Sequence, residues 1–199
     1  MIYSYNFSEG SRWEADFSHT YSLVCPSRNS FIQEADAIVN SYNEEMKGHD
    51  YISLAHKELF SVGARASLVC SFESYGAPLI TIANSIGTDV NGYALYGDHY
   101  EIVAYEGGCN VWYITKAPDG AKRPFLNDCC LRVNFPIEAG GKIELDVATG
   151  KRPGFISVSL CGQNFDLPVP KLNDEFYIGF TACEGINRIY SAVIEQPEG

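Results

Sequence analysis

Residues 98–112 (DHYEIVAYEGGCNVW) concentrate the side chains of this chain that are best suited to holding a small polar ligand. Sugars present C–H faces that stack on aromatic rings, and hydroxyl groups that pair with carboxylates, amides and guanidinium groups. Asn110 and Trp112 alternate along one expected strand, so they share a face of it. The strand before it supplies His99, Glu101 and Tyr105. We therefore predict a saccharide-contacting surface here, with the alternative that Trp112 is an ordinary core or edge aromatic.

A second strand offers one more candidate for this surface. Residues 63–74 (GARASLVCSFES) alternate with period two, which predicts one apolar face and one mainly polar face. Arg65 lies on the polar face. If this face and the 98–112 hairpin line one sheet, Arg65 joins the surface as a partner for sugar hydroxyls.

Strand signals of this kind dominate the chain, and glycine-containing turns separate the short apolar runs. The last two strands are expected at 176–182 and 188–195. Three hairpins are predicted, joining 93–96 to 99–105, 99–105 to 109–114, and 142–147 to 155–160.

The stretch 30–50 gives mixed signals. Apolar residues recur at helical spacing from Phe31 to Met46, and Ser30 with Gln33 resembles a helix capping box. The sequence NSYN at 40–43 is typical of a turn instead. We expect irregular structure with at most one short helix, and we leave helix and loop open.

Many strands at short spacing, with little helix, predict a sandwich or a barrel. The chain has 199 residues, which fits one large domain of this kind. We therefore predict an all-β fold in which residues 1–199 form a single two-sheet antiparallel β-sandwich, with roughly six or seven strands in each sheet.

The formal net charge is −11, and no basic block occurs. Such a surface repels phosphate backbones and anionic lipid head groups, so we expect neither nucleic acid nor a membrane as a partner. Neutral sugars or cations suit it better, although acidic charge also simply keeps proteins soluble. The N-terminal residues 1–7 lack the basic and apolar regions of a signal peptide, so a cytoplasmic location is expected, or secretion if a leader has been removed.

The seven cysteines are odd in number and contain no CxxC motif. They fit reduced thiols without a disulfide, several of them in the core. The adjacent Cys129 and Cys130 lack further ligands at metal spacing, so no metal site is predicted there.

The C-terminal third carries a family resemblance. The segment 176–185 (FYIGFTACEG), followed by 189–194 (IYSAVI), resembles the closing strands of concanavalin A-like lectins and glucanases. The preceding hairpin 142–163 is similar to the pair of strands that comes before them in that superfamily. The resemblance implies a jelly-roll sandwich of one flat and one curved sheet, with sugars met on the concave side or at its rim loops. Fold alone does not define function.

Within that superfamily, family 16 glycoside hydrolases carry a strand that reads E-x-D-x-x-E in its bulged form. Residues 101–106 (EIVAYE) match both glutamates, whereas Val103 replaces the central aspartate. The resemblance implies Glu101 as the nucleophile and Glu106 as the acid/base. A retaining glycosidase holds two such carboxyl groups about 5–5.5 Å apart, which here needs a bulge that brings both to one face of the strand. Without the bulge, they are two glutamates of a solvated hairpin.

The segments 89–91 (DVN) and 98–99 (DH) bear a loose likeness to the calcium loop of legume lectins, although the spacing differs. Asp-x-Asn before glycine is also ordinary turn chemistry. We expect no cofactor, and structural calcium is the alternative.

Three functions stay open. The first is a carbohydrate-binding, lectin-like module that holds an oligosaccharide or polysaccharide on the concave sheet. The second is a glycoside hydrolase that uses Glu101 and Glu106, so whether the chain is an enzyme is left open. The third is a structural or protein-interaction sandwich without a sugar site. The sequence gives neither the identity of the sugar nor the oligomeric state.

Overall fold

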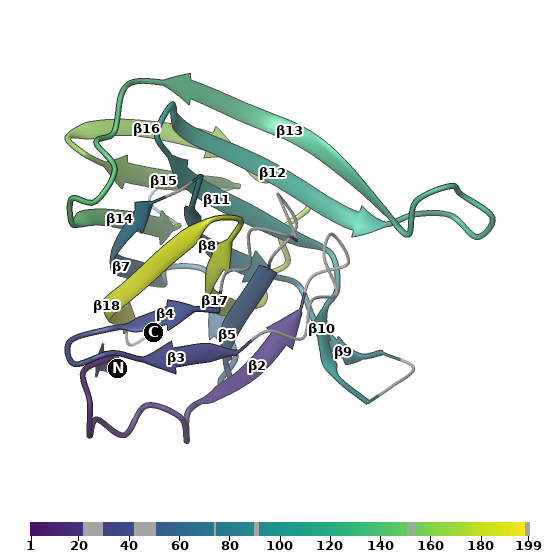
Figure 1. Cartoon of the computed structure of the whole chain (residues 1–199). Coiled ribbons are helices and arrows are strands. Elements are labelled where there is room, and N and C mark those ends of the chain that lie inside the picture. Colours follow the sequence, from purple (N-terminus) through teal and green to yellow (C-terminus); the bar gives the residue numbers. More distant parts are fainter. Residues whose placement is uncertain are drawn as a thin grey trace.

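The computed structural model describes residues 1–21, 30–41, 51–73, 75–89, 92–150, 152 and 154–197. These residues form two stacked β-sheets (Figure 1), and none of them is in a helix. Apart from the parallel pair β10 with β2, the paired strands are antiparallel. The expected all-β jelly-roll sandwich is confirmed.

The first sheet has eight strands among the described residues, in the order β16-β15-β14-β7-β18-β4-β3, with β1 also paired to β18. Its strands are β1 (Ile2–Asn6), β3 (Phe31–Gln33), β4 (Ile38–Asn40), β7 (Arg65–Glu73), β14 (Ile143–Thr149), β15 (Phe155–Leu160), β16 (Gln163–Pro168) and β18 (Ile186–Glu195).

The second sheet has ten, in the order β13-β12-β11-β8-β17-β5-β2-β10-β9, with β6 also paired to β17. Both sheets exceed the expected six or seven strands because short pieces of two or three residues extend or flank them. The strands are β2 (Phe17–Tyr21), β5 (Tyr51–His56), β6 (Phe60–Ser61), β8 (Ala77–Ala83), β9 (Ile86–Thr88), β10 (Ala94–Tyr96), β11 (His99–Tyr105), β12 (Gly108–Lys116), β13 (Phe125–Asn134) and β17 (Glu175–Cys183).

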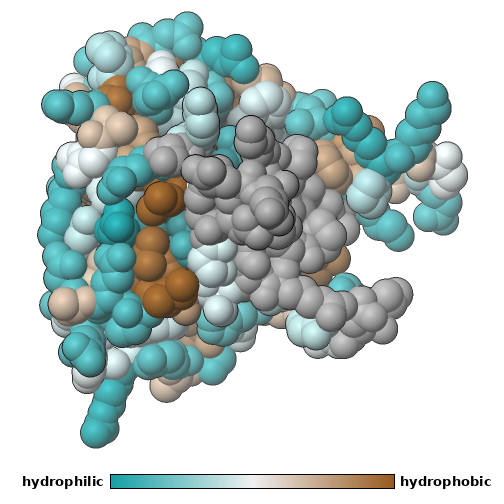
Figure 2. All heavy atoms as spheres, in the orientation of Figure 1, coloured by the Kyte–Doolittle hydropathy of each residue, from teal (hydrophilic) through white to brown (hydrophobic). Residues whose placement is uncertain are grey.

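The core lies between the two sheets and is built from alternate strand residues. Ala66, Leu68 and Cys70 of β7 are at most 2% exposed, as is Ile102 of β11. The period-two pattern of 63–74 is thereby confirmed, because burial of alternate apolar residues is the main force that stacks the sheets. The outer surface visible in Figure 2 is mainly hydrophilic, which fits the net charge of −11.

Two of the predicted hairpins are confirmed and one is wrong. β11 pairs with β12 and β14 pairs with β15, and the closing strands β17 and β18 form as expected. β10 does not pair with β11, because both edges of β11 are already occupied by β8 and β12. β10 instead joins β2 and β9, and Tyr96 at its end is 1% exposed.

The stretch 30–41 is extended rather than helical, so a short helix is excluded for this part. β3 and β4 pair with each other, and β4 pairs with β18. Ile38, Val39 and Asn40 are all buried, which a strand at this sheet position allows. Residues 42–50 lie outside the described residues.

No helix in the described part of the chain is long and apolar enough to cross a membrane. No disulfide joins any two of the six described cysteines, and Cys25 lies outside the described ranges.

Candidate functional site

Strand β11 carries three of the predicted site residues to the outward face of the ten-stranded sheet. Tyr100 and Ile102 point into the core between the sheets. Because side chains alternate along a strand, His99, Glu101 and Tyr105 lie on the opposite face.

Strand β12 adds two more predicted residues to the same face. Val111 and Tyr113 belong to the core, so Asn110 and Trp112 lie on the outward face. In the antiparallel ladder Glu101 is paired directly with Trp112. The carboxylate and the indole are therefore cross-strand neighbours, which alternation and hairpin register together produce.

These strands border a hollow of about 380 Å³ on that face. Small-molecule pockets commonly span about 300–1,000 Å³, so the hollow suits a ligand of one or a few sugar rings. The predicted residues that line it are Glu101, Tyr105, Glu106, Asn110 and Trp112.

An apolar cluster forms the floor of the hollow. Leu79 and Val103 are buried there outside the sandwich core, and Tyr105 and Trp112 pack on them while remaining half-buried. Trp112 therefore lies outside the sandwich core, and its packing against this cluster restricts its movement. Its indole is held by packing and still reaches the hollow.

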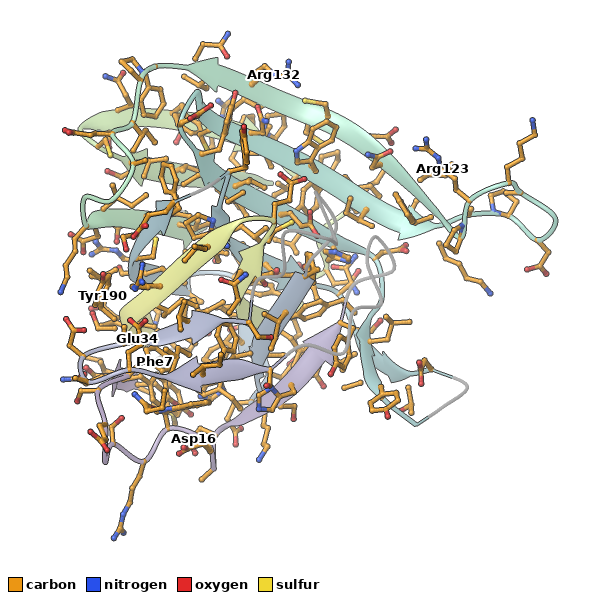
Figure 3. All side chains as sticks on the ribbon, viewed as in Figure 1. Phe7, Asp16, Glu34, Arg123, Arg132 and Tyr190 are labelled. Carbon is orange, nitrogen blue, oxygen red and sulfur yellow. The ribbon has the colours of Figure 1, made fainter. Side chains whose placement is uncertain are left out.

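Asn110 is held in place from the edge of the sheet. The guanidinium Nε of Arg132 on β13 donates a hydrogen bond to Asn110 Oδ1 at 3.2 Å; Figure 3 labels this arginine. Because the side-chain oxygen is engaged, the amide nitrogen of Asn110 is the group available to donate to a ligand hydroxyl.

His99 lies beneath Glu101 and completes a buried pair. His99 is fully buried, and its Nε2 lies 3.1 Å from Oε1 of Glu101, which is 6% exposed. His99 Nδ1 is 2.6 Å from the carbonyl oxygen of Gly97, which can only accept, so Nδ1 carries a proton. The contact between Nε2 and Oε1 then needs one further proton, on either partner. The pair as a whole is neutral.

A row of buried hydroxyl groups continues from this pair across the sheet. Tyr96 and Ser53 are 2.7 Å apart, Ser53 and Thr181 2.6 Å, and Thr181 and Thr81 3.0 Å. Tyr51 lies 3.5 Å from Thr81, and burial raises the pKa of its hydroxyl well above the usual value. These hydroxyls satisfy one another, so this part of the face is structural and stabilises the floor of the hollow.

The rim holds Tyr75 and Glu184, two functional candidates that the sequence analysis missed. Both line the hollow and both have positive φ, 69° at Tyr75 and 55° at Glu184. Such a conformation is rare for an aromatic residue and tends to gather at ligand sites. Tyr75 is also 80% exposed, as a stacking platform must be. An aromatic residue before glycine, in a turn between two apolar runs, was the available signal for Tyr75.

Close packing holds the two rim turns together. A β-carbon on Gly76 would lie 2.3 Å from the carbonyl oxygen of Ile186, so the turn after β7 touches the turn after β17. Asn40 Nδ2 donates to the Gly185 carbonyl at 2.8 Å, and the Asn187 backbone N–H donates to Asn40 Oδ1 at 2.7 Å. These contacts fix the two turns that form the rim on this side of the hollow.

Glu106 is exposed in the turn that follows β11. The pairing of β11 with β8 and β12 runs without a register shift, and the nearby bulge lies between β12 and β13. Four residues of extended strand carry the chain roughly 13 Å from Glu101 to Tyr105, and Glu106 follows in the turn. The described strand therefore lacks the bulge that a closely spaced carboxyl pair would need.

Arg65 is not part of this site, which corrects the expectation that it joins the surface. It lies on β7, which pairs with β14 and β18 in the other sheet. There its guanidinium forms an ion pair with Asp146 at 2.9 Å. Sequence alternation placed Arg65 on the polar face of its strand, but it could not tell which sheet the strand would join.

No group of three or more His, Cys, Asp or Glu side chains that could hold a metal gathers within the described ranges. The carboxylate of Asp98 accepts hydrogen bonds from Thr115 at 2.6 Å and from Tyr113 at 3.3 Å. Asp89 accepts one from the Tyr93 backbone N–H at 2.9 Å, which is the ordinary turn chemistry considered above. Residues 90 and 91 lie outside the described residues.

Comparison with known proteins shows the fold. No family model and no curated protein matches the sequence. The β-agarase A of Zobellia galactanivorans is similar in structure, with a TM-score of 0.63, 10% identity, and coverage of 100% of this chain and 93% of that one. The carbohydrate-binding module CBM66 of Bacillus subtilis has a TM-score of 0.54 at 11% identity, over 89% of this chain and 96% of that one. The lumenal domain of VIP36 has a TM-score of 0.53 at 12% identity, over 86% of this chain and 83% of that one.

These likenesses define the class of fold. The chain is a concanavalin A-like jelly roll, as the closing strands 176–194 implied. At identities of 10–12% the comparisons carry the architecture alone, and the function has to be argued from the hollow itself.

Proposed function

We propose that this chain is a carbohydrate-binding protein, and that its hollow holds an oligosaccharide or a segment of a polysaccharide. Trp112 is the stacking platform, and Glu101 and Asn110 are the hydroxyl partners. The observation that carries the proposal is a half-buried indole paired across a ladder with a carboxylate, beside an amide, in a hollow of about 380 Å³.

The proposal fits how sugars are recognised. An aromatic ring covers the C–H face of a sugar, and contacts of this kind are worth on the order of 1–2 kcal/mol. Carboxylate and amide groups around the ring then fix the orientation through hydroxyl hydrogen bonds. Tyr105 from the same floor and Tyr75 from the rim extend the aromatic surface.

Known proteins of similar fold support the ligand class. β-Agarase A has been described in complex with oligoagarose, and the VIP36 domain in a form bound to Ca²⁺ and Man3GlcNAc. These ligands belong to those proteins, and they support a saccharide here by analogy of fold.

Binding is favoured over hydrolysis by the local geometry of β11. A retaining hydrolase needs its two carboxyl groups about 5–5.5 Å apart, and an inverting one about 6.5–9.5 Å. β11 has no bulge between Glu101 and its end at Tyr105, so nothing in the strand brings Glu101 and Glu106 to one face as a closely spaced carboxyl pair requires. Glu101 is moreover engaged with His99.

The test is a screen of the purified protein against an oligosaccharide array, followed by calorimetric titration of the best ligand. We expect Trp112→Ala to weaken binding about tenfold or more, because the stacking contact is lost. Tyr190→Ala is the matched control, since Tyr190 is a half-buried aromatic on β18 of the other sheet and lies away from Arg132 in Figure 3. This control should bind like the parent.

Thermal and urea unfolding of the same variants distinguishes a Trp112 that serves as a stacking platform from a Trp112 that belongs to the core. A half-buried platform should cost clearly less stability than the about 3–5 kcal/mol lost when a core aromatic becomes alanine. If no glycan binds the parent protein and Trp112→Ala lowers the free energy of unfolding by about 3–5 kcal/mol, Trp112 is a structural residue. The chain is then a structural or protein-interaction sandwich without a sugar site. Release of reducing sugar from a bound ligand would instead favour the hydrolase.

A further inference from the structure

The hollow is extended along the strands of the ten-stranded sheet. Trp112 is paired with Glu101, and Glu101 with Thr81, so these three residues form one row across the sheet. Ala77, the first residue of β8, is four residues from Thr81 and therefore lies roughly 13 Å along the sheet from this row. Tyr75 lies beyond Ala77, in the turn between β7 and β8. Because Trp112, Ala77 and Tyr75 all line the hollow, it extends over about this length.

Aromatic side chains lie at both ends of this length. Trp112 is at one end. Tyr105, the last residue of β11, is at the other end, four residues along the strand from Glu101. A β-carbon on Gly107 would collide with the Tyr105 ring, so that ring lies against the turn that follows β11. β8 runs antiparallel to β11, which puts the start of β8, and Tyr75 before it, at this same end. The hollow therefore has an indole at one end and two phenol rings at the other.

Tyr75 has no structural role that explains its conformation. Its φ is 69°, in the left-handed region that aromatic residues rarely adopt. It is 80% exposed, the highest value among the large hydrophobic residues in the described ranges. Within those ranges no hydrogen bond or ring contact reaches its side chain. The ring therefore contributes little packing that would offset the cost of this backbone conformation.

The turn itself holds Tyr75 in this conformation. The Gly76 backbone N–H donates to the Glu73 carbonyl oxygen at 2.9 Å and closes the turn. A β-carbon on Gly76 would lie 2.9 Å from Phe72 Cβ and would collide with the Ile186 carbonyl oxygen, so the chain has no other path here. Strain that is fixed by its surroundings in this way gathers at ligand sites. The fixed turn also means that little backbone freedom is lost when the ring meets a ligand.

We propose, on the basis of the saccharide-binding function above, that the hollow is a groove for a saccharide chain with two aromatic subsites. Trp112 stacks on one sugar unit, and Tyr75 stacks on another unit further along the same chain. A pyranose ring is only a few covalent bonds across, each about 1.5 Å long, so a single ring does not reach from one subsite to the other. The ligand class is therefore an oligosaccharide of several units, selected over mono- and disaccharides.

Two length series of neutral glycans test the proposal. The probes are β-1,4-linked glucose oligomers of one to six units and oligoagaroses of two to six units, titrated by calorimetry. In the series that binds, affinity should rise about tenfold or more between the disaccharide and the tetrasaccharide, a difference of about 1.4 kcal/mol, and then level off once both subsites are filled.

Tyr75→Ala should remove this rise and leave the affinity for the disaccharide unchanged. Trp112→Ala should weaken the binding of every length, because short ligands bind beside Glu101 and Asn110 at that end. Tyr75→Phe should keep the rise, since the phenyl ring still stacks. Tyr93→Ala is the matched control, because Tyr93 is an exposed tyrosine before β10, towards the other edge of the sheet, and does not line the hollow. This control should bind every length like the parent.

Tyr75→Gly separates a binding role from a structural one. Glycine adopts positive φ without steric cost, so the variant should unfold at a urea concentration no lower than the parent does. It should nevertheless lose the gain in affinity with chain length. A clearly lower urea midpoint would mean that the tyrosine ring supports the fold, which overturns the proposal.

An affinity that does not rise with chain length also overturns it, as does a loss on Tyr75→Ala that is equal for the disaccharide and the tetrasaccharide, because both rings would then hold one sugar unit. Absence of binding by both series has the same consequence. If a glycan on the array still binds in a way that depends on Trp112, the saccharide site stands and only its second subsite is refuted. If the parent protein binds no glycan of any length, both proposals fail together.

Discussion

Gly179 on β17 is the position where a single methyl group tests how the ten-stranded sheet curls. A β-carbon there would lie 1.9 Å from the Tyr96 hydroxyl oxygen, 3.0 Å from Tyr96 Cζ and 3.1 Å from Ser53 Oγ. Real β-carbon contacts essentially never fall below 3.0 Å. Tyr96 is 1% exposed and is held by Ser53, so the ring has no free space to move into. Gly179→Ala should therefore lower the free energy of unfolding by about 3 kcal/mol, at the upper end of overpacking effects.

Tyr96→Phe supplies the second arm of a double-mutant cycle. Alone it removes one hydrogen bond and should cost about 1 kcal/mol, while Ser53 keeps its bond to Thr181. In the double variant the closest contact becomes Cζ at 3.0 Å, so part of the clash is relieved. We expect about 1–2 kcal/mol of favourable coupling in urea denaturation of the four proteins. Strict additivity would refute the packing of β10 over β17.

Two further predictions concern titration and thiol chemistry. His56 is 1% exposed, and its Nδ1 accepts from the Glu58 backbone N–H at 3.1 Å while Nε2 faces the Tyr5 hydroxyl at 2.7 Å. Burial lowers the pKa of His56, so the unfolded chain binds its proton first. Stability is then full above a pH of about 6.5 and falls as the pH drops below it, and His56→Gln should flatten that fall in urea midpoints measured from pH 8 to 5. Burial raises the pKa of Cys109 to about 12 and that of Cys70 further, so these two thiols should react with a disulfide reagent only after unfolding, and their prompt reaction in the native protein would contradict the packing.

Local pattern was sufficient for much of the fold and for part of the site. Period two in 63–74 and in 99–105 assigns each side chain to one of two faces, because the strand geometry leaves no third option. The same rule placed Glu101 and Tyr105 on one face, and Asn110 and Trp112 on one face of the next strand. The short turn at 106–107 makes the two strands neighbours, so the grouping of these four residues followed from sequence alone.

Contacts between distant strands decided the rest. Whether the polar face of β7 joins the sheet of β11 depends on partners about 80 residues away, since Arg65 is paired with Ala148. The same non-local competition removed β10 from the expected hairpin, because β8 had taken the free edge of β11. Local turn chemistry could not resolve either case.

The sequence by itself determined that this chain is a β-sandwich with an aromatic and acidic hairpin, because alternation and turn residues act over a few neighbouring positions. Only the tertiary structure decided that this hairpin borders a hollow, that Tyr75 and Glu184 complete its rim, and that Arg65 lies elsewhere. The physical reason is that strands β11 and β12 and the turns after β7 and β17 form the hollow, and the order β12-β11-β8-β17 in the ten-stranded sheet brings these distant segments of the chain together.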